Sequence, residues 1–176
     1  MRQITNHSLR FASHQNQLLL LGLLIVLFLM SACNGNVIYS ESQRVDEKKW
    51  NMNEQLYFNV EVADTTQFYD FCIDVRNTNT YAYSNLFLFI NTTFPDGSIA
   101  ADTLECPLAD LDGKWYGKNS GHYIDGRYYL RRNVRFPMSG NYRFQVSHGM
   151  RDTNVVGIRD ISLLITRHDN AHESHK

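Results

Sequence analysis

Three cysteines carry the most reactive side chains of this 176-residue chain, and Cys33 has the most informative surroundings. Ser31 and Ala32 stand directly before it and are small enough to leave room for a peptidase. The thiol of Cys33 is a nucleophile that can accept a diacylglycerol group through a thioether. This spacing predicts cleavage before Cys33 and lipidation of its side chain.

An unbroken apolar run, Leu18 to Met30, precedes this cysteine. It is shorter than the roughly 20 residues that a helix needs to cross a bilayer, and it fits the core of a signal peptide. The stretch before the run carries Arg2 and Arg10 and no acidic residue, as expected on the cytoplasmic side of an inserting segment. The end of the run resembles the lipobox of bacterial lipoproteins, although Met30 stands where leucine is usual. We therefore expect residues 1–32 to be a cleaved lipoprotein signal peptide, with an ordinary signal peptide or an uncleaved anchor helix as the alternatives.

The rest of the chain has the length of one domain and a mildly acidic balance. All 18 acidic residues follow Cys33, whereas two of the 17 basic residues precede it, which argues against nucleic acid as a partner. Residues 33–50 are polar and lack periodicity, so we expect the lipidated cysteine and a flexible tether. A folded domain is expected over residues 51–167. Residues 168–176 carry His168, His172 and His175 and are expected to be a disordered tail.

Alternating apolar and polar residues over short segments are typical of strands with one buried face. Leu86 to Ile90 is a continuous apolar run and is expected to be a strand covered on both faces. Pro95-Asp96-Gly97-Ser98 predicts a tight turn that closes a hairpin to Ile99 to Glu105. These segments and the lack of a convincing amphipathic helix predict an all-β fold, an antiparallel β-sandwich of jelly-roll type. The alternating segments are Leu56 to Val62, Phe68 to Arg76, Tyr128 to Phe136, Tyr142 to Val146 and Ile161 to Ile165.

Lipidation of Cys33 leaves an even pair of cysteines, Cys72 and Cys106. In an oxidising periplasm this pair could close a disulfide worth about 3 to 4 kcal/mol. The alternative is two buried free thiols. The alternation around Cys72 places it opposite the apolar face of its strand, which counts slightly against a thiol deep in the core.

A loop rich in Asp and Gly carries three aromatic residues, Trp115, Tyr116 and Tyr123. Their rings could stack on a sugar or on a partner protein, so the loop is a candidate interaction site. A membrane-anchored carbohydrate-binding module is the functional alternative that this loop supports. The competing interpretation is that Trp115 covers the edge of the sandwich.

Catalytic signatures are mostly missing from the sequence. It has no serine in a nucleophile elbow, no histidine pair with zinc spacing and no glycine-rich phosphate loop. Asp110-Leu111-Asp112-Gly113 starts like a calcium loop but lacks the later ligands. Asp102 and Glu105 are the best carboxylates for a hydrolase, although abundant Asp in loops is ordinary. We expect neither an enzyme nor a metal site, and no cofactor besides the diacylglycerol and acyl lipid on Cys33.

An ordered series of motifs covers nearly the whole chain after Cys33. The motifs are Asp64-Thr65, Val75-Arg76-Asn77-Thr78, Tyr81 to Leu86, Pro95-Asp96-Gly97, Asp102-Thr103, Leu108-Ala109-Asp110, Gly113 to Gly117, His148-Gly149-Met150-Arg151 and Gly157-Ile158-Arg159-Asp160-Ile161. This series resembles the GldH family of gliding-motility lipoproteins. The resemblance implies a non-catalytic Bacteroidetes envelope lipoprotein that acts through protein contacts within the gliding machinery, which is linked to the type IX secretion apparatus.

Two further expectations concern placement and modification. The ten residues after Cys33 contain one acidic residue, Glu41, and in such bacteria an acidic cluster there accompanies surface display. Its absence favours an outer-membrane lipoprotein whose domain faces the periplasm. Asp64-Thr65-Thr66 and Asp102-Thr103-Leu104 resemble the O-glycosylation signal of periplasmic proteins of this phylum, which makes Thr65 and Thr103 candidate glycosylation sites.

Overall fold

The computed structural model describes residues 36–169, and no helix that could cross a membrane occurs among them. Cys33, His172 and His175 lie outside this range. The described residues form short and long β-strands joined by loops. In chain order the strands are β1 (Val37–Arg44), β2 (Trp50–Asn51), β3 (Leu56–Val62), β4 (Tyr69–Thr78), β5 (Asn85–Thr93), β6 (Ile99–Pro107), β7 (Lys118–Ser120), β8 (Tyr123–Val134), β9 (Gly140–His148), β10 (Asn154–Val155) and β11 (Ile158–Arg167).

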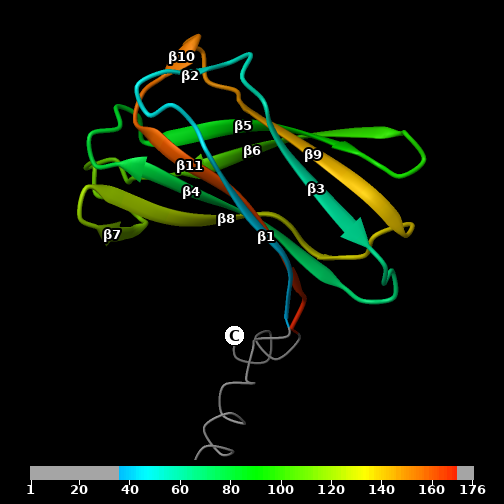
Figure 1. The fold of residues 1–176 in the computed structure, drawn as a ribbon. Helices are drawn as coiled ribbons and strands as arrows, with labels where there is room; N and C mark the ends of the chain where they lie inside the picture. Colours follow the sequence, from blue (N-terminus) through cyan, green and yellow to red (C-terminus); the bar gives the residue numbers. More distant parts are fainter. Residues whose placement is uncertain (1–35, 170–176) are drawn as a thin grey trace, which may run out of the picture. The chain divides into compact units, whose positions relative to one another are not determined.

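Two antiparallel sheets face each other in the described part of the chain (Figure 1). The five-stranded sheet has the order β1-β11-β4-β8-β7, and the four-stranded sheet has the order β3-β9-β5-β6. A small ribbon of β2 and β10 lies across one end of the sandwich, at the top of Figure 1. The predicted all-β, antiparallel β-sandwich is therefore confirmed.

The core lies between the two sheets and follows from the alternation of the strands. In β3, Leu56, Phe58, Val60 and Val62 are buried while the residues between them are exposed. Each buried side chain of this size contributes about 1.5 to 3 kcal/mol to folding. Trp50 of β2 is fully buried and closes one end, and its indole N–H donates to the carbonyl of Glu54 at 3.3 Å.

The expected tether over residues 33–50 is wrong for most of its length, because Val37–Arg44 forms β1. The strand pairs with β11 from Val37 opposite Thr166 to Arg44 opposite Asp160. Most side chains of β1 are exposed, so its sequence carries no apolar alternation. Backbone hydrogen bonds to β11 hold β1 in place. Such bonds do not require apolar side chains at alternate positions, so the sequence pattern does not indicate the strand.

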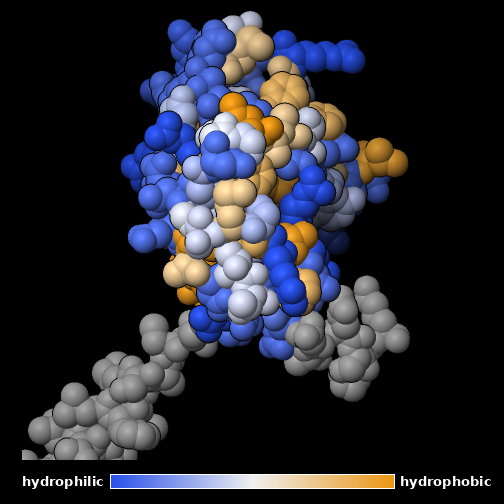
Figure 2. All heavy atoms as spheres, turned by 90° about the vertical axis from the view of Figure 1, so that its right-hand side faces the viewer, coloured by the Kyte–Doolittle hydropathy of each residue, from blue (hydrophilic) through white to orange (hydrophobic). Residues whose placement is uncertain are grey.

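The prediction that Leu86 to Ile90 is covered on both faces is also wrong. Leu86, Leu88 and Ile90 point into the core, whereas the side chain of Phe89 is 47% exposed on the outer face. Gly149 makes room for this ring, because a Cβ atom there would lie 2.8 Å from Cζ of Phe89. Exposed apolar groups of this kind are scattered among hydrophilic residues on the side of the domain shown in Figure 2.

His168 was expected in the disordered tail and instead belongs to the folded domain. Its backbone N–H donates to the carbonyl of Phe68 at 2.8 Å. Its side chain is 2% exposed, and Nδ1 lies 2.8 Å from Oδ1 of Asp70. The domain thus continues past the predicted boundary at residue 167.

Candidate functional site

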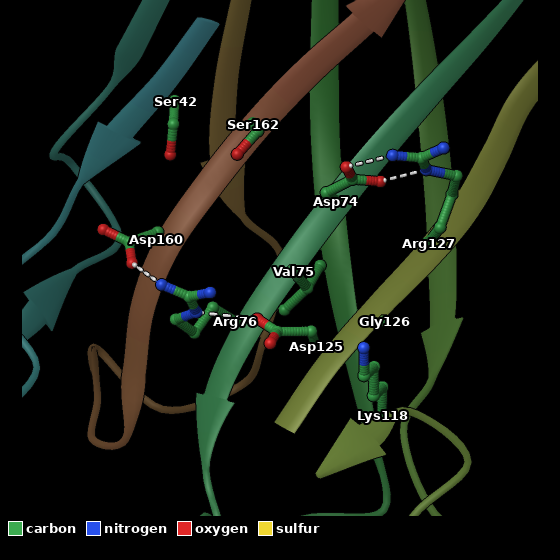
Figure 3. Close-up of a pocket in the computed structure, with 10 residues that line it drawn as sticks. All are labelled: Ser42, Asp74, Val75, Arg76, Lys118, Asp125, Gly126, Arg127, Asp160 and Ser162. Carbon is green, nitrogen blue, oxygen red and sulfur yellow. Dashed lines mark hydrogen bonds and ion pairs between the residues drawn. The ribbon is translucent and has the colours of Figure 1, made fainter. Parts of the chain in front are cut away.

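The outer side of the five-stranded sheet carries an ordered set of charges, shown in Figure 3. Asp74 of β4 lies opposite Arg127 of β8 in the strand register. The guanidinium of Arg127 donates from Nε to Oδ1 of Asp74 at 2.7 Å and from Nη2 to Oδ2 at 2.8 Å. This two-point contact fixes both side chains in one orientation. We call the outer side the charged face; it consists of Arg44, Asp74, Arg76, Asp125, Arg127 and Asp160.

A row of alternating charges crosses four strands of this face next to the Asp74–Arg127 pair. Nε of Arg76 donates to Oδ1 of Asp125 at 2.6 Å, and its Nη1 lies 3.7 Å from Oδ2 of Asp160. Nε of Arg44 lies 3.6 Å from the other oxygen of Asp160. Strand register produces the row, because Arg44 pairs with Asp160, Asp160 with Arg76, and Arg76 with Asp125.

Hydrogen bonds favour the charged form of one carboxyl group of the face, that of Asp125. The hydrogen bond from Arg76 lowers the pKa of Asp125, and a second bond from Ser120 acts in the same direction. The same contact raises the pKa of Arg76, and the bond to Asp74 raises the pKa of Arg127. A catalytic proton donor needs a carboxyl pKa shifted upward, so Asp125 is suited to binding and not to acid catalysis.

A depression of about 500 Å³ lies over the row of charges and the Asp74–Arg127 pair and is open to solvent. Ser42 of β1 and Ser162 of β11 face it, and neither hydroxyl has a hydrogen-bond partner within residues 36–169. Hydroxyl groups both donate and accept. The depression therefore offers fixed charges of both signs together with adaptable hydroxyl groups.

The two remaining cysteines are free, so the predicted disulfide between Cys72 and Cys106 is wrong for this structure. Cys106 of β6 belongs to the core between the sheets. Cys72 of β4 lies on the opposite side of the five-stranded sheet, because it alternates with the core residues Phe71 and Ile73. A sheet therefore separates the two thiols. Burial raises the pKa of Cys72 to about 11 and that of Cys106 to about 12.

The three aromatic residues of the predicted interaction loop have different surroundings. Trp115 packs against the core cluster, in agreement with the alternative that it covers the edge of the sandwich. Tyr116 is 64% exposed. The hydroxyl of Tyr123 donates to Oε2 of Glu47 at 3.1 Å, and the guanidinium of Arg159 lies 5.6 Å from its ring centroid. Among residues 36–169 no ring contact joins these three side chains, so the structure does not assemble them into one platform.

The carboxylates considered for hydrolysis point away from one another. Asp102 and Glu105 lie three residues apart on β6 and therefore on opposite faces of the four-stranded sheet. Asp102 forms an ion pair with Arg131, and Glu105 accepts a hydrogen bond from Asn85 at 2.8 Å. Within residues 36–169, no group of three or more His, Cys, Asp or Glu side chains could hold a metal ion.

The candidate glycosylation sites differ in exposure. Thr103 is exposed on β6, the edge strand of the four-stranded sheet. Thr65 is half-buried in the loop between β3 and β4, where the Asp64 carboxylate accepts from the backbone N–H of Thr66 at 2.8 Å. Both residues keep the status of predictions.

The charged face was not predicted from the sequence, because the sequence shows its six residues but not which of them lie side by side. Asp74 and Arg127 are 53 positions apart, and only the register of β4 against β8 brings them together. The usable signal was the alternation of Asp74 and Arg76 with apolar residues on one strand. That pattern indicates a polar outer face but does not identify its partners.

The fold and this face define the class of protein: an antiparallel β-sandwich that presents an ion-paired sheet surface. Residues 37–165 match the family model described as GldH lipoprotein, from the first residue of β1 into β11. The chain belongs to the GldH lipoprotein family.

Two relatives are similar to this chain over most of its length. The gliding motility lipoprotein GldH homolog of Christiangramia forsetii is 32% identical over 154 residues, which cover 84% of this chain and 94% of the relative. The gliding motility lipoprotein GldH of Flavobacterium johnsoniae is 26% identical over 154 residues, 84% of this chain and 95% of the relative.

Among solved structures, an arabinose-bound α-L-arabinofuranosidase is similar to 72% of this chain with a TM-score of 0.37 and 13% sequence identity. The chain spans about a fifth of that enzyme, since the match covers 19% of its length. A likeness this low carries no argument about function.

Proposed function

We propose that this protein is a lipid-anchored, non-catalytic envelope component of the gliding motility machinery. In this proposal Cys33 carries the lipid, and the domain faces the periplasm from the outer membrane and contacts proteins of the type IX secretion apparatus. The observation that carries the proposal is the family match over residues 37–165, which spans the sandwich from β1 into β11. Both relatives bear the name gliding motility lipoprotein.

The charged face supports a role in protein contact. Its Asp74 and Arg127 side chains are 34% and 54% exposed, so a partner can reach them without unfolding the sheet. Charges of both signs in fixed positions select a partner by complementarity and penalise wrong partners by like-charge contacts. The lowered pKa of Asp125 keeps this carboxyl ionised at neutral pH, which suits recognition better than proton transfer.

Site-specific photo-crosslinking in the native envelope tests this proposal. A photoreactive amino acid at Ser42 would lie over the depression of the charged face, and the same group at Glu61 would lie on an exposed position of β3 in the other sheet. We expect motility or secretion proteins to be captured from Ser42 and to be depleted at the Glu61 control. If neither position of the correctly localised protein captures any such protein, the proposed function is wrong.

A further inference from the structure

We propose that the end of the sandwich at which β1 begins rests on the phospholipid headgroups of the membrane. This anchor-proximal end consists of the exposed side chains of Val37, Ile38, Phe68, Arg135 and Arg167. The inference rests on the lipidation of Cys33 in the proposed function. It goes beyond that function by naming the protein surface that meets the lipid and the chemical groups that it meets.

The chain between Cys33 and the sandwich is too short to hold the domain far from the membrane. β1 begins at Val37, and the carbonyl of Asn36 already accepts a hydrogen bond from the backbone N–H of Arg167 at 2.7 Å. Cys33 is three residues before Asn36, a path of at most about 11 Å when fully extended. A tether reaching to residue 50 would have spanned about 55 Å. The short path brings the beginning of β1 to the lipid surface.

Neighbouring strands extend this end away from β1. The backbone N–H of His168, after β11, donates to the carbonyl of Phe68, which precedes β4. Tyr69 of β4 lies opposite Val134 of β8, and Arg135 follows directly. The anchor-proximal end is therefore a continuous surface across four strands. In Figure 1 the start of β1 and the end of β11 lie together at the bottom, opposite β2 and β10 at the top.

The side chains of this end match the chemistry of a lipid interface. Val37 is 47% and Phe68 40% exposed, so both offer apolar surface to the outer part of the acyl region. The guanidinium of Arg135 lies 4.1 Å from the ring centroid of Phe68, which pairs a cation with an apolar body. Residues with an apolar body and a charged or polar tip are favoured where headgroups meet acyl chains. The guanidinium groups of Arg135 and Arg167 can donate to lipid phosphates.

Charge alone does not hold the domain in this position. Asp64 is close enough to Arg167 to interact with it electrostatically, and it offsets part of the positive charge of this end. The covalent lipid supplies the attachment, and the anchor-proximal end sets the orientation. The charged face and the β2–β10 end then remain accessible from the periplasm.

Quenching of tryptophan fluorescence by brominated phospholipids tests this orientation. The mature lipidated protein is reconstituted into vesicles of phosphatidylethanolamine and phosphatidylglycerol, with or without bromine near the headgroup end of the acyl chains. Phe68→Trp places a reporter at the anchor-proximal end, and Met52→Trp places one at an exposed position beside β2. The unsubstituted chain gives the background, because Trp50 of β2 is fully buried and Trp115 packs against the core.

We expect brominated lipid to remove most of the added fluorescence of Phe68→Trp and to leave that of Met52→Trp unchanged. Equal signals with and without bromine at both positions, or quenching at Met52→Trp alone, would overturn the proposed orientation. Sedimentation with vesicles and intact mass are measured on the same samples. Vesicle-bound, lipidated protein without quenching overturns the orientation and leaves the anchor intact. Protein without added lipid mass that stays in the supernatant overturns the anchor, and the orientation with it.

Discussion

At the scale of single residues, the Asp74–Arg127 pair gives the sharpest test of the charged face. Arg127→Asp reverses one charge and places two carboxylates side by side, whereas the combined exchange Asp74→Arg with Arg127→Asp restores an ion pair in the opposite direction. Exposed pairs contribute roughly 0.2 to 1 kcal/mol, so we expect either variant to lower the free energy of unfolding by about 1 kcal/mol or less.

Capture of a partner should respond differently from stability. Both variants should lose the crosslinks made from Ser42, because the partner meets one reversed charge in Arg127→Asp and two in the combined exchange. Urea unfolding and crosslinking yield measured on the same preparations separate the two effects. Retention of full crosslinking in the exchanged variant would show that Asp74 and Arg127 do not contact the partner.

The thiols of Cys72 and Cys106 should be inert in the folded protein. Burial raises their pKa values to about 11 and about 12, so both remain protonated at neutral pH, and the thiolate is the reactive form. We expect a thiol-specific reagent to label neither residue in buffer and both in denaturant without reductant. Mass spectrometry counts the labels, and failure to label both in denaturant would reveal a disulfide.

His148 links stability to pH. Burial lowers the pKa of His148 below its ordinary value of 6.5, although the hydrogen bond to the Trp50 carbonyl acts in the opposite direction. Between the two pKa values the unfolded chain binds a proton that the folded chain does not. The contribution of His148 is therefore complete above about pH 6.5 and is lost as the pH falls below it, by at most about 1.4 kcal/mol per pH unit.

Thermal unfolding of the wild type and of His148→Gln between pH 7.5 and about 5.5 measures this contribution. We expect the wild type to lose stability more steeply than the variant as the pH falls. Asp64, Asp96 and Asp125 have lowered pKa values, so their contributions are lost at more acidic pH and do not overlap this window. Equal slopes for the two proteins would exclude His148 as the cause.

At the scale of elements, β1 is the strand that differs most from the sequence-based expectation, because a flexible tether was predicted there. This strand pairs with β11 from Val37 to Arg44. The β1 amides that donate hydrogen bonds to β11 should therefore exchange hydrogen slowly. An opening free energy of about 2 to 3 kcal/mol for an edge strand corresponds to roughly 30-fold to 150-fold protection. Hydrogen exchange read by mass spectrometry on peptides covering residues 37–44 checks this value, with the loop around Leu111 as the exposed control. If β1 exchanges as fast as that loop, the strand pairing is wrong and residues 37–44 are a flexible tether.

The strands that were predictable have alternating side chains. Leu56 to Val62 buries every second residue, and in Tyr69 to Val75 every second residue belongs to the core between the sheets. The apolar pattern of both strands therefore follows directly from the packing of the two sheets. β1 buries little, and β2 and β10 have two residues each, so neither kind leaves a periodic signal. The charged face could not be predicted for a different reason. The alternation around Asp74 shows which way its side chain points, but the sequence does not show that Arg127 lies opposite.

At the scale of the whole molecule, the sandwich and the lipid anchor should be separable. The core cluster is built from residues between Val45 and Ile165. Within residues 36–169, β1 pairs with β11 and Gln43 of β1 donates to the carbonyl of Tyr57 in β3. Cys33→Ser removes the nucleophile that would carry the lipid and changes none of these contacts. We therefore expect a folded domain with an unchanged unfolding temperature that moves from the membrane to the soluble periplasmic fraction.

Fractionation of cells, intact mass and thermal unfolding check this outcome together. Ser31→Thr, which keeps a small residue before Ala32 and leaves the cysteine in place, is the matched control and should remain in the membrane fraction. Intact mass distinguishes a released mature domain from unprocessed chain, which the apolar run from Leu18 to Met30 would keep in the membrane. A processed Cys33→Ser protein that still sediments with membranes would show that the domain is held there by contacts other than the lipid.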